Sequence, residues 1–446
     1  MAQRKKRPSA LTVLADAYLL LLMTLMVFAF SGKGYVSLQN DKWSVFLPLV
    51  GGYVALSILI WAEETIIGLR APSELMEAMR SASWVHRLMA AYLVWTLLSA
   101  LLSPYGAAVW LGATRNEGVL TIALYVFSFF LLSRFGRPKP WMLWVLGVTV
   151  TLQSVICLLQ LRGGNPLGLY PEGVNYFDAG KLYSGAFLGT VGNVDFLGSY
   201  YCIVVPILLA SLLRLRSPLR FALLLPLALS ALVIVRMQVL SCIVGLGAGC
   251  VLALPVMLPI GAKAKTRAAL AILGAGALGL LLLFAVDLGG PAGTIHRILH
   301  GDVPRSVDSG RLYIWREVLE RAAKRPLFGY GPDTLSMAGI EPFRRYDPEQ
   351  QKTLLGYIDA AHNEYLNIFF HQGIPALAAY LGALVAAAAA WWKRSTENGV
   401  AAILGAAALC YSVQAFFNIS VFFVASLFWA VLALLVGWEH QEKERK

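Results

Sequence analysis

Long apolar runs constrain this chain more than any other feature. Residues 219–259 form a nearly unbroken apolar run, and a helix needs about 20 apolar residues to cross a bilayer. This run is therefore long enough for two crossings with almost no loop between them. Over the whole chain 58% of the residues are hydrophobic and 14% are charged, against about 25% charged residues in ordinary globular domains. The composition excludes a disordered chain, a coiled coil and a typical soluble enzyme, because the excess apolar surface must face lipid.

The apolar runs predict an all-α polytopic membrane protein that forms a single integral membrane domain over residues 1–446. We expect about twelve transmembrane helices and a long, partly helical outer loop between the ninth and the tenth. The predicted spans are 11–30, 44–62, 84–102, 119–133, 141–160, 195–213, 219–235, 238–259, 268–288, 364–392, 400–417 and 420–438.

The basic residues predict the orientation of these spans. Lys and Arg cluster at the N-terminus, after the fourth, sixth, eighth and tenth predicted spans and in the C-terminal tail. The loop 63–83 after the second span is mixed, with four Glu residues against Arg70 and Arg80. Cytoplasmic loops carry an excess of Lys and Arg, so both termini are expected in the cytoplasm. The net charge of +12 is then explained by topology, and no nucleic-acid partner is expected. Two polar segments fall on the outer face, residues 161–194 and residues 289–363, of which the second is the large extracytoplasmic loop.

The large outer loop contains a predicted helix. In SVDSGRLYIWREVLERAAKRPLFGYGP, Asp308 or Ser309 can cap a helix that starts near Arg311, and Pro326 ends it. Leu312, Trp315, Val318 and Leu319 are expected on its apolar face. The same periodicity also fits a purely structural helix that packs its apolar face on the protein and exposes its charged face to solvent.

Polar groups gather where this loop enters the tenth span. His362, Asn363 and Glu364 are adjacent there, and they are candidates for a functional cluster as well as for an ordinary structural helix start. Arg236 and Gln238 are expected at the tip of the outer hairpin within residues 219–259, because burying an arginine at mid-bilayer costs about 2.5–3.5 kcal/mol or more. An interfacial, snorkelling arginine satisfies that placement equally well.

A metal or nucleotide site is not expected. His296 and His300 can share one helical turn as metal ligands, but no third ligand has suitable spacing. The chain has no P-loop and no dinucleotide fingerprint. We therefore predict no cofactor.

Four motifs together resemble those of one protein family. They are LGATRNEGVLTIALY (111–125), TVGNVDFLGSYY (190–201), RLYIW with RPLFGYG (311–331) and AHNEYLNIFFHQGIPA (361–376). In this order they resemble the O-antigen ligase family, which includes O-antigen ligases and related polysaccharide polymerases. The resemblance covers about residues 100–380.

The resemblance implies metal-independent glycosyl transfer on the outer face of the bacterial cytoplasmic membrane. It implies a glycan on undecaprenyl diphosphate as donor and a hydroxyl of lipid A core or of another glycan as acceptor. Family members use arginines near the diphosphate and a histidine in the long loop, roles that fall here on Arg311 and His362. Many members carry an arginine in the outer hairpin, where Arg236 lies, although RMQVLSC departs from the commoner Ser-Arg-Gly pattern.

The chemistry of these residue types agrees with that role. Guanidinium groups bind phosphate oxygens bidentately and stay charged, so Arg311, Arg236 and Arg115 are candidate diphosphate ligands. An imidazole with a pKa near 6.5 is a suitable base for an attacking hydroxyl, so His362 is the candidate base. Arg311 is the other candidate catalytic residue. Candidate supporting residues are Asn363, Glu364, Trp315 and Asn193.

Other functions stay open at this point. Within the family, a repeat-unit polymerase and a protein O-oligosaccharyltransferase fit the same motifs. A transporter or flippase also fits a layout of twelve spans with both termini inside, although carriers keep ionisable groups near the bilayer midplane. A non-enzymatic assembly scaffold is a third alternative.

Overall fold

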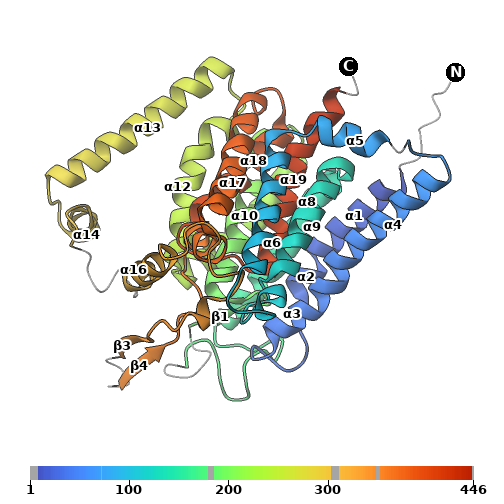
Figure 1. The fold of residues 1–446 in the computed structure, drawn as a ribbon. Coiled ribbons are helices and arrows are strands. Elements are labelled where there is room, and N and C mark those ends of the chain that lie inside the picture. The colour runs from blue at the N-terminus through green and yellow to red at the C-terminus, as the bar shows by residue number, and fades with distance from the viewer. Residues whose placement is uncertain (1–8, 72, 179–184, 303–310, 348–351, 444–446) are drawn as a thin grey trace.

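The structure, a computed structural model, describes all residues except 1–8, 72, 179–184, 303–310, 348–351 and 444–446. The described residues form a bundle of long helices with short elements at one end (Figure 1). The all-α class is confirmed, because the only strands among the described residues form two small two-stranded sheets.

The first half of the chain supplies the helices on one side of the bundle. They are α1 (Ala10–Met23), α2 (Leu25–Phe28), α3 (Leu38–Phe46), η1 (Leu47–Gly51), α4 (Gly52–Ile66), α5 (Ser73–Arg80), α6 (Trp84–Leu101), α7 (Ala108–Leu111), α8 (Val119–Phe135) and α9 (Pro140–Gln160). A short antiparallel pair, β1 (Phe187–Leu188) and β2 (Gly192–Asn193), follows.

The second half contains the rest of the bundle and the long loop. Its helices are α10 (Val194–Arg214), η2 (Pro218–Leu223), α11 (Leu224–Met237), α12 (Leu240–Met257), α13 (Ala262–Ala285), α14 (Gly290–Leu299), α16 (Arg311–Ala322), η3 (Leu335–Met337), α17 (Glu364–Arg394), α18 (Gly399–Ala415) and α19 (Phe422–Lys443). The antiparallel hairpin of β3 (Phe343–Asp347) and β4 (Lys352–Gly356) precedes α17.

Each of the twelve predicted spans falls on an apolar helix. Among the described residues, nine helices are long and apolar enough to cross a membrane. The remaining three predicted spans fall on shorter apolar helices, at Val119–Phe135, Gly399–Ala415 and Phe422–Gly437. The predicted fold of a polytopic helical protein is therefore confirmed, while the number twelve stays a prediction.

The arrangement of the helices brings the predicted outer segments to one end of the bundle. In Figure 1, α2, α3, β1 and the β3–β4 hairpin lie at the lower end, whereas α5 lies at the upper end near the described start of α1 and end of α19. The α10 helix is mostly buried inside the bundle, and α13 stands apart with none of its apolar window buried. A helix that is apolar all round and unburied is suited to contact lipid.

Basic side chains within the apolar helices satisfy free carbonyl groups at helix ends. Lys42 is fully buried, and its Nζ donates to the carbonyls of Met26 (2.8 Å) and Val27 (3.0 Å). Arg214 donates to the carbonyls of Met257 (3.1 Å) and Leu258 (2.9 Å) at the end of α12. The last carbonyls of a helix have no partner within it, so these cations stabilise helix ends.

The described part of the long loop is folded on the bundle, where α16 packs on α17. The predicted helix near Arg311 is confirmed as α16, but its proposed caps Asp308 and Ser309 lie outside the described residues. The predicted apolar face is partly wrong, because Leu312 and Leu319 are exposed. The buried face consists of Ile314, Val318 and Ala322, which pack with the first turns of α17 in a small second core. The β3–β4 hairpin was not predicted.

The α17 helix is interrupted at Gly373, where φ is 83°. The chain segment after α16 pairs with this break through three backbone hydrogen bonds. Tyr330 donates to the Phe370 carbonyl (3.0 Å), Gly331 donates to the His371 carbonyl (2.8 Å), and Ile374 donates to the Pro326 carbonyl (2.8 Å). The motifs RPLFGYG and FFHQGIP, which are far apart in sequence, therefore hold each other in place.

Candidate active site

The candidate site begins with a carboxylate that organises the loop before α8. Asp333, which is 3% exposed, accepts hydrogen bonds from the backbone N–H groups of Thr114 (3.1 Å) and Arg115 (2.8 Å) and from the Thr114 hydroxyl (3.1 Å). Gly112 has a φ of 102°, and a Cβ there would collide with the Asp333 carboxylate. The loop GATRNEG is thus wrapped around Asp333, and this fixes the backbone of Arg115.

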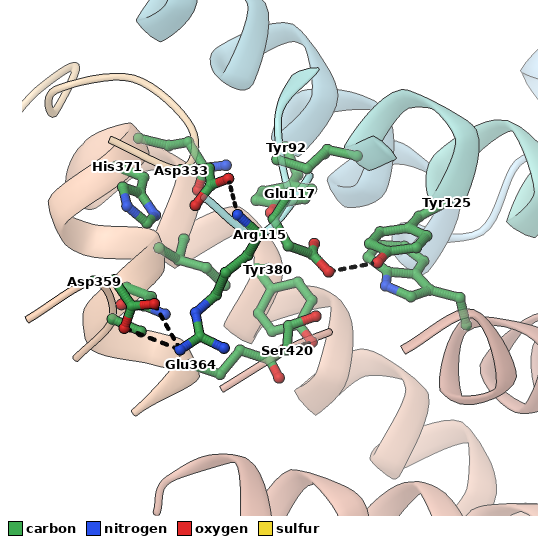
Figure 2. Close-up of a pocket in the computed structure, with 16 residues that line it drawn as sticks. Tyr92, Arg115, Glu117, Tyr125, Asp333, Asp359, Glu364, His371, Tyr380 and Ser420 are labelled. Atoms are coloured by element: carbon green, nitrogen blue, oxygen red, sulfur yellow. Dashed lines mark hydrogen bonds and ion pairs between the residues drawn. The ribbon is translucent and has the colours of Figure 1, made fainter. Parts of the chain in front are cut away.

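The Arg115 side chain extends from this loop across a polar pocket to Asp359 (Figure 2). Its Nη2 lies 2.8 Å and 2.9 Å from the two carboxylate oxygens of Asp359. The guanidinium carbon also lies 5.9 Å from the centre of the Phe196 ring on α10. Among the described residues, the Nε of Arg115 has no hydrogen-bond partner. The guanidinium is therefore held from one side and keeps a donor for a further acceptor.

His362 lies where several charged segments meet. It is half-buried with a φ of 50°, directly before α17. The charges of Asp195, Arg115, Arg311 and Asp359 all act on its ring. Burial lowers the pKa of His362 below its usual value of 6.5. The two arginines lower this pKa further, and the two aspartates oppose them. The imidazole is consequently neutral at pH 7.

The α16 helix is tied to the histidine segment by Trp315. The Trp315 Nε1 donates to the Ala361 carbonyl (2.9 Å), next to His362. Its ring packs edge-on against Phe416, with centroids 5.6 Å apart. This contact positions the first turn of α16, and with it Arg311, beside the histidine segment.

Two asparagines cap the helices that approach the site. Asn193 Oδ1 accepts from the backbone N–H of Asp195 (2.8 Å) at the start of α10. Asn363 Oδ1 accepts from the backbone N–H of Leu366 (3.0 Å) at the start of α17. The polar side chain of an N-cap satisfies a free backbone donor in this way. Asn193 thus holds the helix start that carries Asp195, and Asn363 holds the helix start that follows His362.

Glu364 points into the interior rather than toward His362's charged neighbours. The carboxylate is 6% exposed and accepts from the hydroxyls of Tyr380 (2.6 Å) and Tyr411 (3.1 Å). It lines a cavity of about 70 Å³ together with Arg115, Glu117 and His371. Figure 2 shows these side chains, with Tyr92, Tyr125 and Tyr380 forming part of the wall.

The cavity is richer in carboxyl groups than the sequence predicted. Asp333, Asp359, Glu117 and Glu364 all line it. Burial raises the pKa of Asp333 and raises that of Glu117 well above its usual range. Glu117 accepts a hydrogen bond from the Tyr125 hydroxyl (2.9 Å). Burial therefore opposes the ionisation of Glu117 in particular, since its carboxyl group lies among other acidic side chains.

The structure therefore brings together some of the predicted site residues and leaves others apart. The charges of Arg115 and Arg311 act on the ring of His362, and Asn193, Trp315 and Asn363 support the neighbouring segments. Arg236 is exposed in the last turn of α11, followed by Gln238 with a φ of 53°, so the predicted hairpin tip is confirmed. Among the described residues, no hydrogen bond, ion pair or ring contact joins Arg236 to the other predicted site residues.

Four polar residues of the site were missed by the sequence analysis, namely Glu117, Asp333, Asp359 and His371. The Gly-Pro-Asp turn at residues 331–333 and the polar pair His371–Gln372 inside an apolar run were available signals. The side chain of His371 lines the cavity, and its Nε2 has no hydrogen-bond partner among the described residues.

These features define a multi-span membrane protein with a polar, charged site at one end of its helical bundle. A comparison with known proteins narrows this class of membrane protein further. Residues 197–381 match the family model described as O-antigen ligase, so this part of the chain is similar to that family. The match supports glycosyl transfer of the O-antigen ligase or polymerase type. No curated protein sequence matches the chain. The matched residues include Arg311 and His362, whereas Arg115 and Asn193 lie before them.

Proposed function

We propose that this protein transfers a glycan from undecaprenyl diphosphate to a hydroxyl acceptor at the outer face of the bacterial cytoplasmic membrane. The observation that carries the proposal is that Arg115 and Arg311 lie close enough to the half-buried His362 for their charges to act on its ring. A base can take the proton of the attacking hydroxyl, and two guanidinium groups can stabilise the charge of a leaving diphosphate.

The reaction is a single displacement. The acceptor oxygen attacks the anomeric carbon, and His362 takes the proton of the attacking hydroxyl. The bond between the anomeric carbon and the diphosphate oxygen breaks, and the electron pair leaves with the diphosphate. One displacement inverts the anomeric configuration of the transferred sugar.

The arginines stabilise the charge that develops on the leaving diphosphate. Arg311 and Arg115 supply fixed positive charge through forked N–H donors, so no metal ion is needed for that step. Arg236 stands exposed at the outer hairpin and extends the positive surface toward the lipid headgroup. Asp359 holds Arg115 in the absence of donor and is replaced there by phosphate oxygens when the donor binds.

The test is glycan transfer by purified protein in liposomes with a lipid-linked donor. His362→Ala and Arg311→Ala should each abolish transfer while the protein still inserts and purifies normally. Arg316→Ala is the matched control, because Arg316 lies on the same helix and is largely exposed in a pair with Glu320. Full transfer by either site variant would refute the assigned roles.

The acceptor class is tested in the same assay. Lipid A core, a second lipid-linked glycan and a protein are offered in separate reactions, and the product distinguishes ligase, polymerase and protein O-oligosaccharyltransferase. Movement of the donor across the bilayer without a new glycosidic bond would instead identify a flippase and overturn the proposal.

A further inference from the structure

A second cavity opens between α17, α18 and α19, in the membrane-embedded part of the bundle. It has a volume of about 230 Å³ and an almost wholly apolar lining. We call it the lateral groove, and its walls include Leu384, Ala388 and Trp391 of α17, Gly405 and Ala408 of α18, and Leu435 of α19. It opens toward lipid at Val385, whose side chain is 69% exposed.

The inner end of the lateral groove depends on a glycine. A Cβ at Gly405 would collide with the Trp391 indole, so the glycine lets this large ring lie flat against α18. Trp391 is 6% exposed. The indole therefore forms a wall of the groove. A larger residue in place of Gly405 would push the indole into the groove.

The outer end of the lateral groove reaches the candidate active site. Tyr365 lines the groove, and its neighbour Glu364 lines the polar cavity. The rings of Tyr365 and Tyr380 lie 6.4 Å apart, and Tyr380 donates to Glu364 (2.6 Å). The hydroxyl of Tyr365 donates to the Ser412 carbonyl (2.6 Å). Tyr365 of the apolar groove thus lies next to Glu364 and Tyr380 of the polar cavity.

The groove runs in the direction that the chain of a bound lipid must take. From Leu381 to Trp391 the α17 helix rises about 15 Å, which is about half of a hydrocarbon layer roughly 30 Å thick. A lipid whose diphosphate is held by Arg115 has to send its chain away from the polar end, between apolar side chains. The lateral groove is an apolar path that starts next to that cavity.

We propose that the lateral groove binds the head-proximal part of the polyisoprenoid chain of the donor lipid. This inference rests on the proposed function for the identity of the occupant. Contact with the groove adds binding energy through buried apolar surface, and it aligns the donor so that its diphosphate faces Arg115 and Arg311. A phospholipid acyl chain is the competing occupant.

The first test fills the groove and varies the length of the donor lipid. Ala388→Trp places a large side chain in the groove, and Ala389→Trp is the matched control, because Ala389 is the next residue, is also exposed and does not line the groove. Ala388→Trp should raise the KM for a long-chain donor about tenfold, as expected when burial of about two methylene groups is lost. With a donor on a short, water-soluble isoprenoid, both variants should match the parent protein.

An unchanged KM for the long-chain donor, or an equal loss with both donors, would overturn the groove assignment. Either result leaves the proposed transfer reaction standing, because that reaction is measured directly in the parent protein. The two hypotheses can therefore fail separately.

The second test needs no activity and no variant. The parent protein in liposomes is exposed to a polyisoprenyl diphosphate that carries a photoreactive group on its third isoprene unit, and labelled peptides are sequenced. Labelling at residues 381–391 and 405–412, displaced by unlabelled polyisoprenyl diphosphate but not by excess phospholipid, supports the proposal. Labelling elsewhere, or displacement by phospholipid alone, refutes it.

Discussion

The carboxylate of Asp333 lies 2.8 Å from the backbone nitrogen of Arg115, although more than two hundred residues separate them in the chain. This hydrogen bond joins the turn after α16 to the loop before α8. It explains how an arginine outside the family-matched segment is held in the same site as His362. The position of Arg115 is thus set by its backbone as well as by its ion pair with Asp359.

Asp333→Asn should weaken this loop. The amide replaces one accepting oxygen with a donor and removes the charge that strengthens three hydrogen bonds. We expect the free energy of unfolding to fall by about 1.5–3 kcal/mol and kcat/KM for glycan transfer to fall about 10–100-fold. Thermal unfolding in detergent and the transfer assay measure the two effects. Asp302→Asn, at an exposed ion pair with Arg297, is the control, and parental activity in Asp333→Asn would contradict the positioning role.

The pH dependence of transfer should follow His362. Because burial and the two arginines lower its pKa below 6.5, the base stays unprotonated into mildly acidic solution, and the acid limb of kcat/KM should lie below pH 6.5. Asp195 raises this pKa, so Asp195→Asn should move the acid limb to still lower pH.

The pH profile of transfer can also contradict the assignment of the acid limb to His362. Glu172→Gln changes an exposed carboxylate in the segment before α10 and should leave the acid limb unmoved. A shift of the limb to higher pH in Asp195→Asn would show that a group other than His362 titrates. The lowered pKa also means that the unfolded chain binds more protons below pH 6.5, so His362 destabilises the fold as the pH falls toward its folded pKa.

Gly373→Ala should disrupt the break in α17. The residue has a φ of 83°, and a Cβ there would collide with the backbone of Pro326 and Leu327. We expect a large drop in the unfolding temperature and loss of transfer, since the backbone pairing of residues 326–331 with α17 is broken. Gly276→Ala on α13 is the matched control, because nothing lies within 4 Å of a Cβ there and Ala favours helices. Equal stability of the two variants would contradict this account.

The orientation of the bundle is a prediction that labelling can check. A reporter cysteine at Glu320 on α16 should react with a membrane-impermeant maleimide in intact cells, whereas one at Lys263 should react only after permeabilisation. Both positions are exposed, and four of the five native cysteines are buried. The reverse pattern would place the long loop in the cytoplasm and eliminate the proposed reaction.

The helices could be predicted from the sequence because a run of apolar residues is a local property. The same holds for α16, whose periodicity is visible in residues 311–322. Its buried face was only partly foreseen, because α16 packs on α17, and this long-range contact selects Ile314 and Ala322 in place of Leu312 and Leu319.

The candidate site could be predicted only where chemistry marks a residue by itself. Arg115 and His362 stand out as polar groups in the loops of an apolar chain, whereas the roles of Arg311 and His362 follow from the resemblance to the O-antigen ligase family. Asp333 and Asp359 look like ordinary loop carboxylates, and their importance arises from what they contact. Arg236 was placed correctly at its hairpin, but sequence alone does not give its distance from the histidine.

The dispersal of the site over many segments has a genetic consequence. Arg115 precedes α8, Asp195 begins α10, Arg311 begins α16 and His362 precedes α17, so a break in the chain near residues 258–261 would leave an incomplete set on each fragment. Two such halves, each inert when produced alone, would have to find each other in the bilayer before either regained function.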